Sequence, residues 1–144
     1  MGTKVTVTFP AVERVALATP RVLVIDDEAP IGRMIKRLLR DTAEVTLLTS
    51  SRQALALLEA GEDFDLILCD LMMPELTGIE VHAALAQTRP ELLSRLHFMT
   101  GGAFTQRAQQ FVRSIQTSCL DKPLDAATLR ALLASAKPRA NEPG

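Results

Sequence analysis

Five polar side chains of this sequence stand at the ends of short apolar runs. Asp26 and Asp27 follow VLVI, Asp70 follows LILC, Thr100 follows HFM, and Lys122 comes shortly after CL. Clustered carboxylates form an all-oxygen site suited to a magnesium ion, whose charge would offset their mutual repulsion. A lysine ammonium and a threonine hydroxyl can each hold an oxygen of a transferring phosphoryl group. If these side chains meet, the set is suited to phosphoryl transfer, with Asp70 as the nucleophile.

The acids after the first apolar run also have a simpler interpretation. Asp and Glu are favoured at helix N-termini, where free N–H groups and the helix dipole stabilise negative charge. Asp26, Asp27 and Glu28 could therefore do no more than open the following helix. This stretch alone does not distinguish a helix start from a chemical site. The distinction depends on the strands and helices predicted for the rest of the chain.

Apolar periodicity predicts how these residues are positioned. Continuous apolar runs predict strands at 22–25, 45–48, 64–69, 96–99 and 119–120. Apolar residues at helical spacing predict helices around 31–39, 54–58, 79–86, 104–115 and 129–136. Ser50 and Asp125 are suited to be N-caps, and Pro30 suits a first helical turn. Strand and helix therefore alternate along the chain.

That alternation predicts an α/β fold in which helices cover both faces of a parallel sheet. In such sheets, ligands bind at the carboxyl ends of the strands. Asp26, Asp27, Asp70, Thr100 and Lys122 all follow predicted strand ends. We therefore expect these five side chains to converge at one edge of the sheet.

Composition narrows the class of protein. The 144 residues are 47% hydrophobic and 23% charged, which suits one domain with a buried core. Sixteen basic and seventeen acidic residues leave a net charge of −1, so nucleic acid is not an expected partner. The apolar runs are too short for a membrane span, and the N-terminus has no apolar core of the signal-peptide kind. We expect no membrane partner and a cytoplasmic location.

Four segments together resemble the receiver domain of two-component signalling proteins: VLVIDDE, LILCDLMMPELTG, HFMTGGA and LDKP. They occur in the family's order, and the similarity covers about residues 21–136. The resemblance implies a flavodoxin-like, five-stranded parallel sheet in the order 2-1-3-4-5, with five helices on its two faces. It implies that Asp70 is the phospho-acceptor, Thr100 the switch hydroxyl and Lys122 the phosphoryl-stabilising lysine. The implied Mg²⁺ ligands are Asp26, Asp27, Asp70 and the backbone carbonyl of Met72.

The same resemblance implies a function. Asp70 would receive a phosphoryl group from a phosphohistidine in a magnesium-dependent reaction. The partner would be the phosphohistidine domain of a histidine kinase or a histidine phosphotransfer protein, in a two-component or phosphorelay pathway. Such a chain is not a conventional enzyme, although it would catalyse its own aspartyl phosphorylation and dephosphorylation.

Three positions depart from the usual pattern of that family or bear on its chemistry. Many receivers have an aromatic residue three positions before the lysine, where this sequence has Cys119. The two positions whose side chains can flank the water that attacks the phosphoryl group are Met72 and Gly102. Neither residue can orient a water molecule by hydrogen bonding through its side chain, so we expect slow loss of the phosphoryl group.

The two ends of the chain differ from the central domain. Residues 1–20 contain GTKVTVTFP, which resembles the last strand of the ATP-binding domain of sensor histidine kinases, followed by a linker. This resemblance implies that the receiver domain is the C-terminal part of a hybrid sensor kinase. A leader with no more than strand propensity is the alternative. Residues 137–144 have no periodic apolar residues, and we expect a mobile tail there.

Two other functions remain open from the sequence. One is a stand-alone response regulator that acts through a change of its surface. The other is a phosphatase of the aspartyl-phosphate kind, in which an aspartate after a strand attacks a phosphate ester. Such phosphatases usually need a second acid two residues after the nucleophile, and Met72 occupies that position.

The strand order also makes a prediction about the cysteines. Cys69 and Cys119 would lie on strands separated by a third strand, roughly 9 to 10 Å apart, which exceeds the reach of a disulfide. We therefore expect two free thiols. The bond between Lys122 and Pro123 is predicted to be cis, because the lysine must turn back into the site directly after a short strand.

Overall fold

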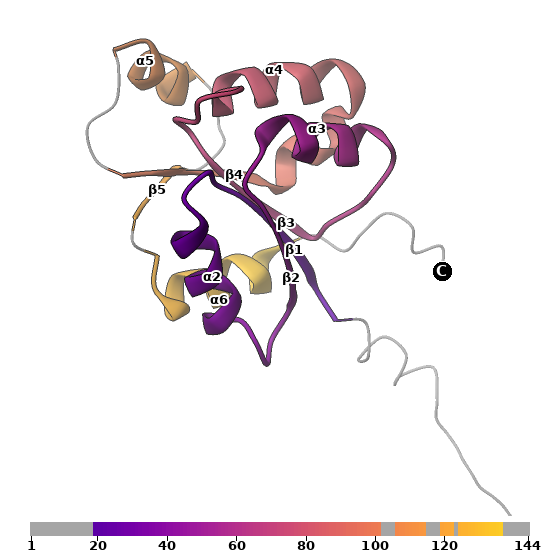
Figure 1. Ribbon diagram of the computed structural model, residues 1–144, viewed down its shortest axis with the longest axis vertical. Coiled ribbons are helices and arrows are strands. Elements are labelled where there is room, and N and C mark those ends of the chain that lie inside the picture. Colours follow the sequence, from indigo (N-terminus) through magenta and orange to yellow (C-terminus); the bar gives the residue numbers. More distant parts are fainter. Residues whose placement is uncertain (1–18, 102–105, 115–118, 123, 137–144) are drawn as a thin grey trace, which may run out of the picture.

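A five-stranded parallel sheet forms the centre of the protein (Figure 1). The computed structural model describes residues 19–101, 106–114, 119–122 and 124–136. The strand order is β2-β1-β3-β4-β5, and every neighbouring pair is parallel. This flavodoxin-like order confirms the predicted fold. The strands are β1 (Arg21–Ile25), β2 (Glu44–Leu48), β3 (Leu66–Asp70), β4 (Leu96–Thr100) and β5 (Cys119–Asp121).

Helices cover both faces of the sheet. Within the described residues these are α2 (Ala29–Leu38), α3 (Ser51–Glu59), α4 (Gly78–Thr88), α5 (Gln106–Ser114) and α6 (Ala126–Ser135). Helices α2 and α6 lie on one face, and α3, α4 and α5 lie on the other (Figure 1). A 3₁₀ helix, η2 (Pro90–Arg95), lies between α4 and β4 and was not among the predicted elements. In the described part of the chain, no helix is long and apolar enough to cross a membrane.

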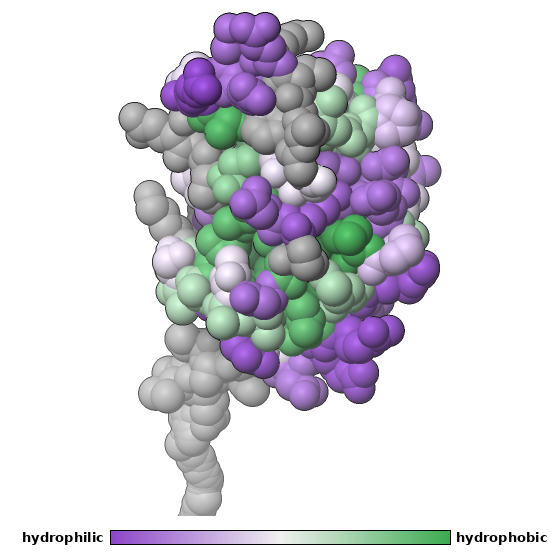
Figure 2. All heavy atoms as spheres, turned by 90° about the vertical axis from the view of Figure 1, so that its left-hand side faces the viewer, coloured by the Kyte–Doolittle hydropathy of each residue, from purple (hydrophilic) through white to green (hydrophobic). Residues whose placement is uncertain are grey.

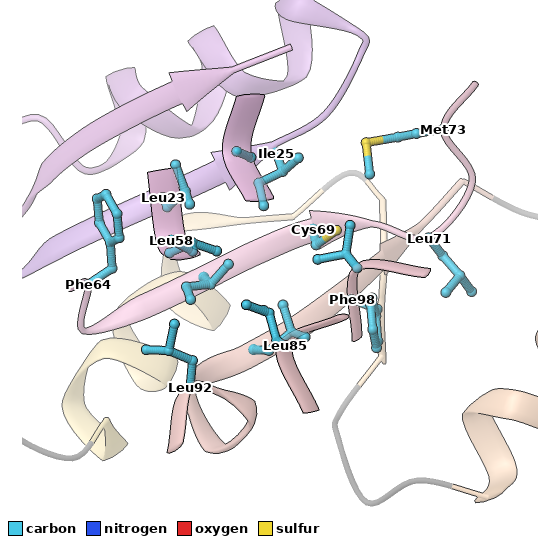
Figure 3. Packing of buried hydrophobic residues seen from close by; sticks show 14 of the residues in the cluster. Leu23, Ile25, Leu58, Phe64, Cys69, Leu71, Met73, Leu85, Leu92 and Phe98 are labelled. Atoms are coloured by element: carbon cyan, nitrogen blue, oxygen red, sulfur yellow. The ribbon is translucent and has the colours of Figure 1, made fainter. Parts of the chain in front are cut away.

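Each face of the sheet packs into its own apolar cluster. Leu23 and Ile25 of β1 lie in the cluster beneath α3, α4 and α5, whereas Val22 and Val24 lie in the cluster beneath α2 and α6. Successive side chains of a strand point to opposite faces, so a strand covered on both sides must be apolar throughout. Figure 3 shows the first cluster, in which Cys69 lies near Ile25 and Leu71.

The helix starts agree with the predicted caps. Ser50 Oγ accepts a hydrogen bond from the backbone N–H of Gln53 (3.2 Å) at the start of α3. Asp125 Oδ1 accepts one from the N–H of Thr128 (2.8 Å) at the start of α6. Pro30 lies in the first turn of α2, where its missing N–H removes no helical hydrogen bond. Local sequence signals therefore set where these helices begin.

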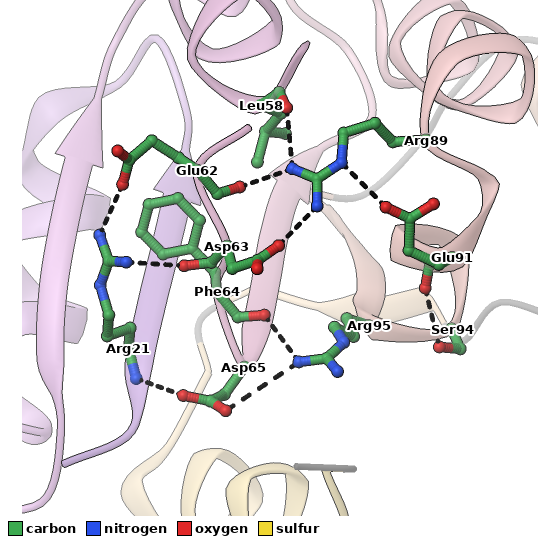
Figure 4. Close-up of polar contacts among 10 residues, drawn as sticks. All are labelled: Arg21, Leu58, Glu62, Asp63, Phe64, Asp65, Arg89, Glu91, Ser94 and Arg95. Carbon is green, nitrogen blue, oxygen red and sulfur yellow. Dashed lines mark hydrogen bonds and ion pairs between the residues drawn. The ribbon is translucent and has the colours of Figure 1, made fainter. Parts of the chain in front are cut away.

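A network of arginine contacts lies at the amino edge of the sheet, opposite the carboxyl ends of the strands (Figure 4). Arg89 donates to the backbone carbonyls of Leu58 (2.9 Å) and Glu62 (2.8 Å) and pairs with Asp63 and Glu91. Arg21 donates to the carbonyl of Asp63 and pairs with the carboxylate of Glu62. Arg95 donates to the carbonyl of Phe64 and pairs with the carboxylate of Asp65. The connection between α3 and β3 is thereby joined to β1 and to the end of α4.

The cysteines behave as predicted. Both Cys69 and Cys119 are free thiols. In the sheet, Phe98 of β4 pairs with Cys69 on one side and with Cys119 on the other. The two cysteines are therefore separated by a full strand. The predicted cis bond involves Pro123, which lies outside the described residues.

Candidate functional site

The strand ends bring the predicted site residues to one edge of the sheet. In the pairing register, Ile25 lies beside Cys69, Asp70 beside Met99, and Thr100 beside Asp121. The residues that follow β1 and β5 therefore flank the ends of β3 and β4. Figure 2 looks onto this edge, where hydrophilic and hydrophobic residues lie side by side.

The ammonium group of Lys122 lies at the centre of this set. Its Nζ is 2.9 Å from Oδ2 of Asp26, 3.3 Å from Oδ2 of Asp70 and 3.4 Å from Oε1 of Glu28. The backbone N–H of Lys122 donates to the carbonyl of Thr100 (2.8 Å), which anchors the chain where β5 ends. The positive charge that the clustered acids require is therefore supplied within the protein by Lys122.

Three carboxylates lie close enough to share a cation. Asp26, Asp27 and Asp70 each place an oxygen within 4.8 Å of the others. Asp26 and Asp70 are buried, and Asp27 is exposed. Oδ1 of Asp26 accepts a hydrogen bond from the N–H of Glu28 (2.8 Å). Among the described residues, the one partner of Oδ2 of Asp26 is the Lys122 ammonium group, at 2.9 Å. Three carboxylates lie near one ammonium group, and the negative charge that remains suits a hard divalent cation.

The electrostatics of the site shift two pKa values. Burial raises the pKa of Asp70 to about 6, the nearby charge of Asp26 acts in the same direction, and Lys122 opposes both. Burial acts to lower the pKa of Lys122, but the carboxylates of Asp26 and Asp70 outweigh it and raise that pKa. The carboxylates thus keep the lysine charged, while their own repulsion is only partly relieved.

The carboxylate of Asp70 is buried but opens onto a hollow. Its Oδ1 accepts a hydrogen bond from the N–H of Met72 (3.2 Å), and its Oδ2 faces Lys122. The hollow has a volume of about 280 Å³ and is lined by Asp27, Glu28, Asp70, Met72, Gly101 and Lys122. A small anionic group can therefore reach Asp70 between an ammonium group and an acidic pair.

Thr100 occupies the predicted strand end but makes an unpredicted contact. The side chain is buried, and its hydroxyl donates to Oδ1 of Asp121 (3.3 Å). Within the described residues it makes no hydrogen bond to Asp70. Asp121 was not among the predicted site residues. Its position directly before Lys122 is a sequence signal that places it near the site, but its pairing with Thr100 depends on the register of β4 and β5.

Of the three positions that depart from the family pattern, Met72 and Cys119 are among the described residues and lie in different surroundings. Met72 is 41% exposed and stands at the rim of the hollow. Cys119 is partly buried and packs against the cluster that contains Phe98, and Phe111 packs against the same cluster. Those two rings meet edge to face with centroids 5.7 Å apart, so aromatic side chains are present near β5 although β5 has none. Gly102 lies outside the described residues.

A larger hollow, of about 600 Å³, lies at the other end of α2. It is lined by four basic residues, by Ala43 and by the first two residues of β2: Arg33, Lys36, Arg37, Arg40, Ala43, Glu44 and Val45. The start of β2 pairs with the start of β1, so this hollow belongs to the amino edge of the sheet. The larger hollow is therefore not the candidate site for phosphoryl transfer, because the clustered carboxylates lie at the opposite edge of the sheet.

Comparison with known proteins identifies a family for most of the chain. The model of the response regulator receiver domain matches residues 22–134. The transcriptional regulatory protein ZraR of Escherichia coli K12 is 34% identical over 119 residues, which are 80% of this chain and 26% of that protein. The chain thus spans about a quarter of the length of this relative.

Solved structures agree. The chemotaxis protein CheY4 of Vibrio cholerae has a TM-score of 0.67 and 27% identity, covering 83% of this chain and 100% of that one. The receiver domain of a sensor histidine kinase of Pseudomonas aeruginosa PAO1, which holds a magnesium ion in its active-site cleft, has a TM-score of 0.69 and 23% identity. That match covers 81% of this chain and 95% of the other, and shows likeness of fold.

Proposed function

Because this chain belongs to the family of response regulator receiver domains of two-component signalling, we propose that Asp70 accepts a phosphoryl group from a phosphohistidine. One observation carries the proposal: the Asp70 carboxylate lies at an open hollow, 3.3 Å from the Lys122 ammonium group and within 4.8 Å of two further carboxylates. No other carboxylate of the described residues combines these three features.

The proposed reaction exchanges one phosphorus bond for another. A carboxylate oxygen of Asp70 attacks the phosphorus, an O–P bond forms, and the N–P bond to the donor imidazole breaks. The imidazole leaves with the electron pair and takes a proton from water. The attack requires the ionised carboxylate, which burial of Asp70 disfavours and a bound Mg²⁺ would favour.

The neighbouring groups would stabilise the charge that builds up on the phosphoryl oxygens. The Lys122 ammonium can leave its ion pair with Asp70 and hold one oxygen, and the Thr100 hydroxyl can donate to another. Asp26, Asp27, Asp70 and the carbonyl of Met72 are the proposed Mg²⁺ ligands. A bound Mg²⁺ would supply charge neutralisation for both the acids and the phosphoryl group.

The proposed donor is the phosphohistidine of a histidine kinase or of a histidine phosphotransfer protein. This donor would approach over the rim of the hollow, where the exposed side chain of Met72 offers an apolar contact. Such a donor would place the reaction in the cytoplasm. The response to phosphorylation could then be onward transfer in a relay or a change of surface.

We further propose that the receiver domain comes from a hybrid sensor kinase. The support is the GTKVTVTFP segment, which resembles the end of a kinase ATP-binding domain. Residues 1–18 lie outside the described part of the chain. Autophosphorylation of a longer chain that contains the preceding kinase, followed by transfer to Asp70, would test this proposal.

The phospho-acceptor itself is tested by labelling. The chain is incubated with magnesium and acetyl phosphate, and the acid-stable, base-labile phosphate is located by mass spectrometry. We expect phosphate on Asp70, none in Asp70→Asn, and a steeply reduced rate in Asp27→Ala. Asp41→Asn is the matched control, because Asp41 is exposed and precedes β2 at the far edge of the sheet. Labelling of Asp70→Asn at the parental rate would refute the assignment.

A further inference from the structure

Asp121 occupies a position from which it can control Thr100. The two residues are direct partners in the register of β4 and β5. Paired residues of neighbouring strands point to the same face of the sheet, which places the Thr100 hydroxyl beside the Asp121 carboxylate. The hydroxyl donates to Oδ1 of Asp121 over 3.3 Å. The contact is therefore a consequence of the strand pairing rather than of a loop.

The register also separates this pair from the phosphoryl site. Phe98 and Cys119 precede Thr100 and Asp121 by two residues and pack in the cluster beneath α3, α4 and α5. By the alternation of strand side chains, Thr100 and Asp121 share that face. Asp70 follows Cys69 of the same cluster and so has the opposite orientation. While it is bonded to Asp121, the hydroxyl makes no hydrogen bond to Asp70 among the described residues, and Thr100 is not one of the residues that line the hollow at Asp70.

A threonine hydroxyl has one proton to donate. It cannot donate at once to Asp121 and to a phosphoryl oxygen on Asp70. We propose that Asp121 is a positioning residue that retains the Thr100 hydroxyl in the unphosphorylated protein and thereby competes with the phosphoryl group for it. This inference rests on the proposed function of Asp70.

The strength of the contact suits such a competition. The acceptor is a carboxylate, which strengthens a hydrogen bond, but the 3.3 Å distance is long for a hydroxyl donor. Asp121 is exposed, so water can replace the hydroxyl when it leaves. The bond therefore biases the position of Thr100 without preventing its movement, and its removal should change rates by about three- to tenfold.

The test measures the initial rate of Asp70 labelling by acetyl phosphate with magnesium. Asp121→Ala removes the competing acceptor, and we expect labelling to become about three- to tenfold faster. Asp121→Asn keeps an acceptor oxygen in place, and we expect a smaller gain. The control for loss of one carboxylate is Asp41→Asn, which should label at the parental rate. Equal melting temperatures of Asp121→Asn and the parent chain would show that folding is intact.

A double-mutant cycle separates competition for the hydroxyl from simple charge repulsion. Thr100→Val removes the hydroxyl and keeps the shape of the side chain. If Asp121 acts through Thr100, Asp121→Ala should give no acceleration in the Thr100→Val background. An acceleration that persists there, or an unchanged rate in Asp121→Ala alone, would overturn the inference. Absence of labelling on Asp70 in the parent chain would instead overturn the proposed function.

Discussion

The Lys122 ammonium lies closer to Asp26, at 2.9 Å, than to Asp70, at 3.3 Å. Asp26 is completely buried, and its Oδ2 depends on this ion pair. The lysine therefore compensates the charge of a buried acid in the unphosphorylated protein. Its second, proposed role is to bind a phosphoryl oxygen at Asp70.

Removal of that ammonium group should destabilise the metal-free protein. Lys122→Met keeps an unbranched stem but leaves buried carboxylates without their cation. We expect a loss of about 2 to 4 kcal/mol in the free energy of unfolding, measured by urea denaturation with EDTA at about pH 7.5. Lys36→Met, on the exposed face of α2, is the matched control and should cost far less. Similar losses in the two variants would contradict the proposed role of Lys122.

The raised pKa of Asp70 predicts a pH-dependent stability. Burial and Asp26 raise this pKa from 3.8 to about 6, so the folded protein binds the proton more tightly than the unfolded chain does. The contribution of Asp70 to stability therefore falls as pH rises from about 4 to about 6, and its full cost persists above that range. Asp70→Asn removes the cost. Without metal, it should stabilise the protein by up to about 3 kcal/mol near pH 7.5 and by little near pH 4.

The matching measurement is thermal unfolding of the parent and Asp70→Asn at both pH values. Added Mg²⁺ should raise the melting temperature of the parent more than that of the variant, because a ligand that binds only the folded state stabilises it. Stabilisation by the substitution at both pH values alike would mean that titration of Asp70 is not its cause.

The Met72 side chain should prolong the phosphorylated state. It stands at the rim of the hollow and can block, but not orient, a water in line with the O–P bond. We expect slow decay of phosphorylated chain after the donor is removed, and severalfold faster decay in Met72→Asn with Gly102→Glu. Met72→Leu keeps an apolar side chain there and should decay as slowly as the parent. A parent that decays faster than the double variant would show that the side-chain argument is wrong.

The arginine network should matter for stability and not for labelling. Arg89 contacts two carbonyls and two carboxylates with one planar guanidinium group, a geometry that lysine cannot reproduce. Arg89→Lys should lower the free energy of unfolding by about 1 to 3 kcal/mol. Arg40→Lys, in the exposed turn after α2, should change it little. The rate of Asp70 labelling should stay at the parental value in both variants, and a loss specific to Arg89→Lys would require coupling across the sheet.

The strands and the meeting of their ends could be predicted because both follow from apolar runs. A strand buried on both faces must be apolar throughout, and β3, which is buried at every position, shows this most clearly. The acids that follow β1 and the acid that ends β3 then have only one edge of the sheet at which to meet. Their individual roles stay predictions, since position alone does not establish chemistry.

Side-chain partners were harder to predict. The contact between Thr100 and Asp121 depends on the register of β4 with β5, which apolar periodicity does not specify. Glu28 stands next to Asp26 and Asp27 in the sequence, but its approach to Lys122 depends on the path of the chain between β1 and α2. The η2 helix was not predicted because its six residues are too few to show a helical period.

The lysine of the site is attached to the weakest part of the sheet. Strand β5 has only three residues, pairs with β4 alone and is not fully buried at any position, whereas β3 has five buried residues between two neighbours. Local opening of a protein starts where few buried contacts and hydrogen bonds must be broken. Amide hydrogens of β5 should therefore exchange with solvent before those of β3. Each such excursion withdraws Lys122 from the acids, so partial unfolding of this edge and the charge balance of the site are linked.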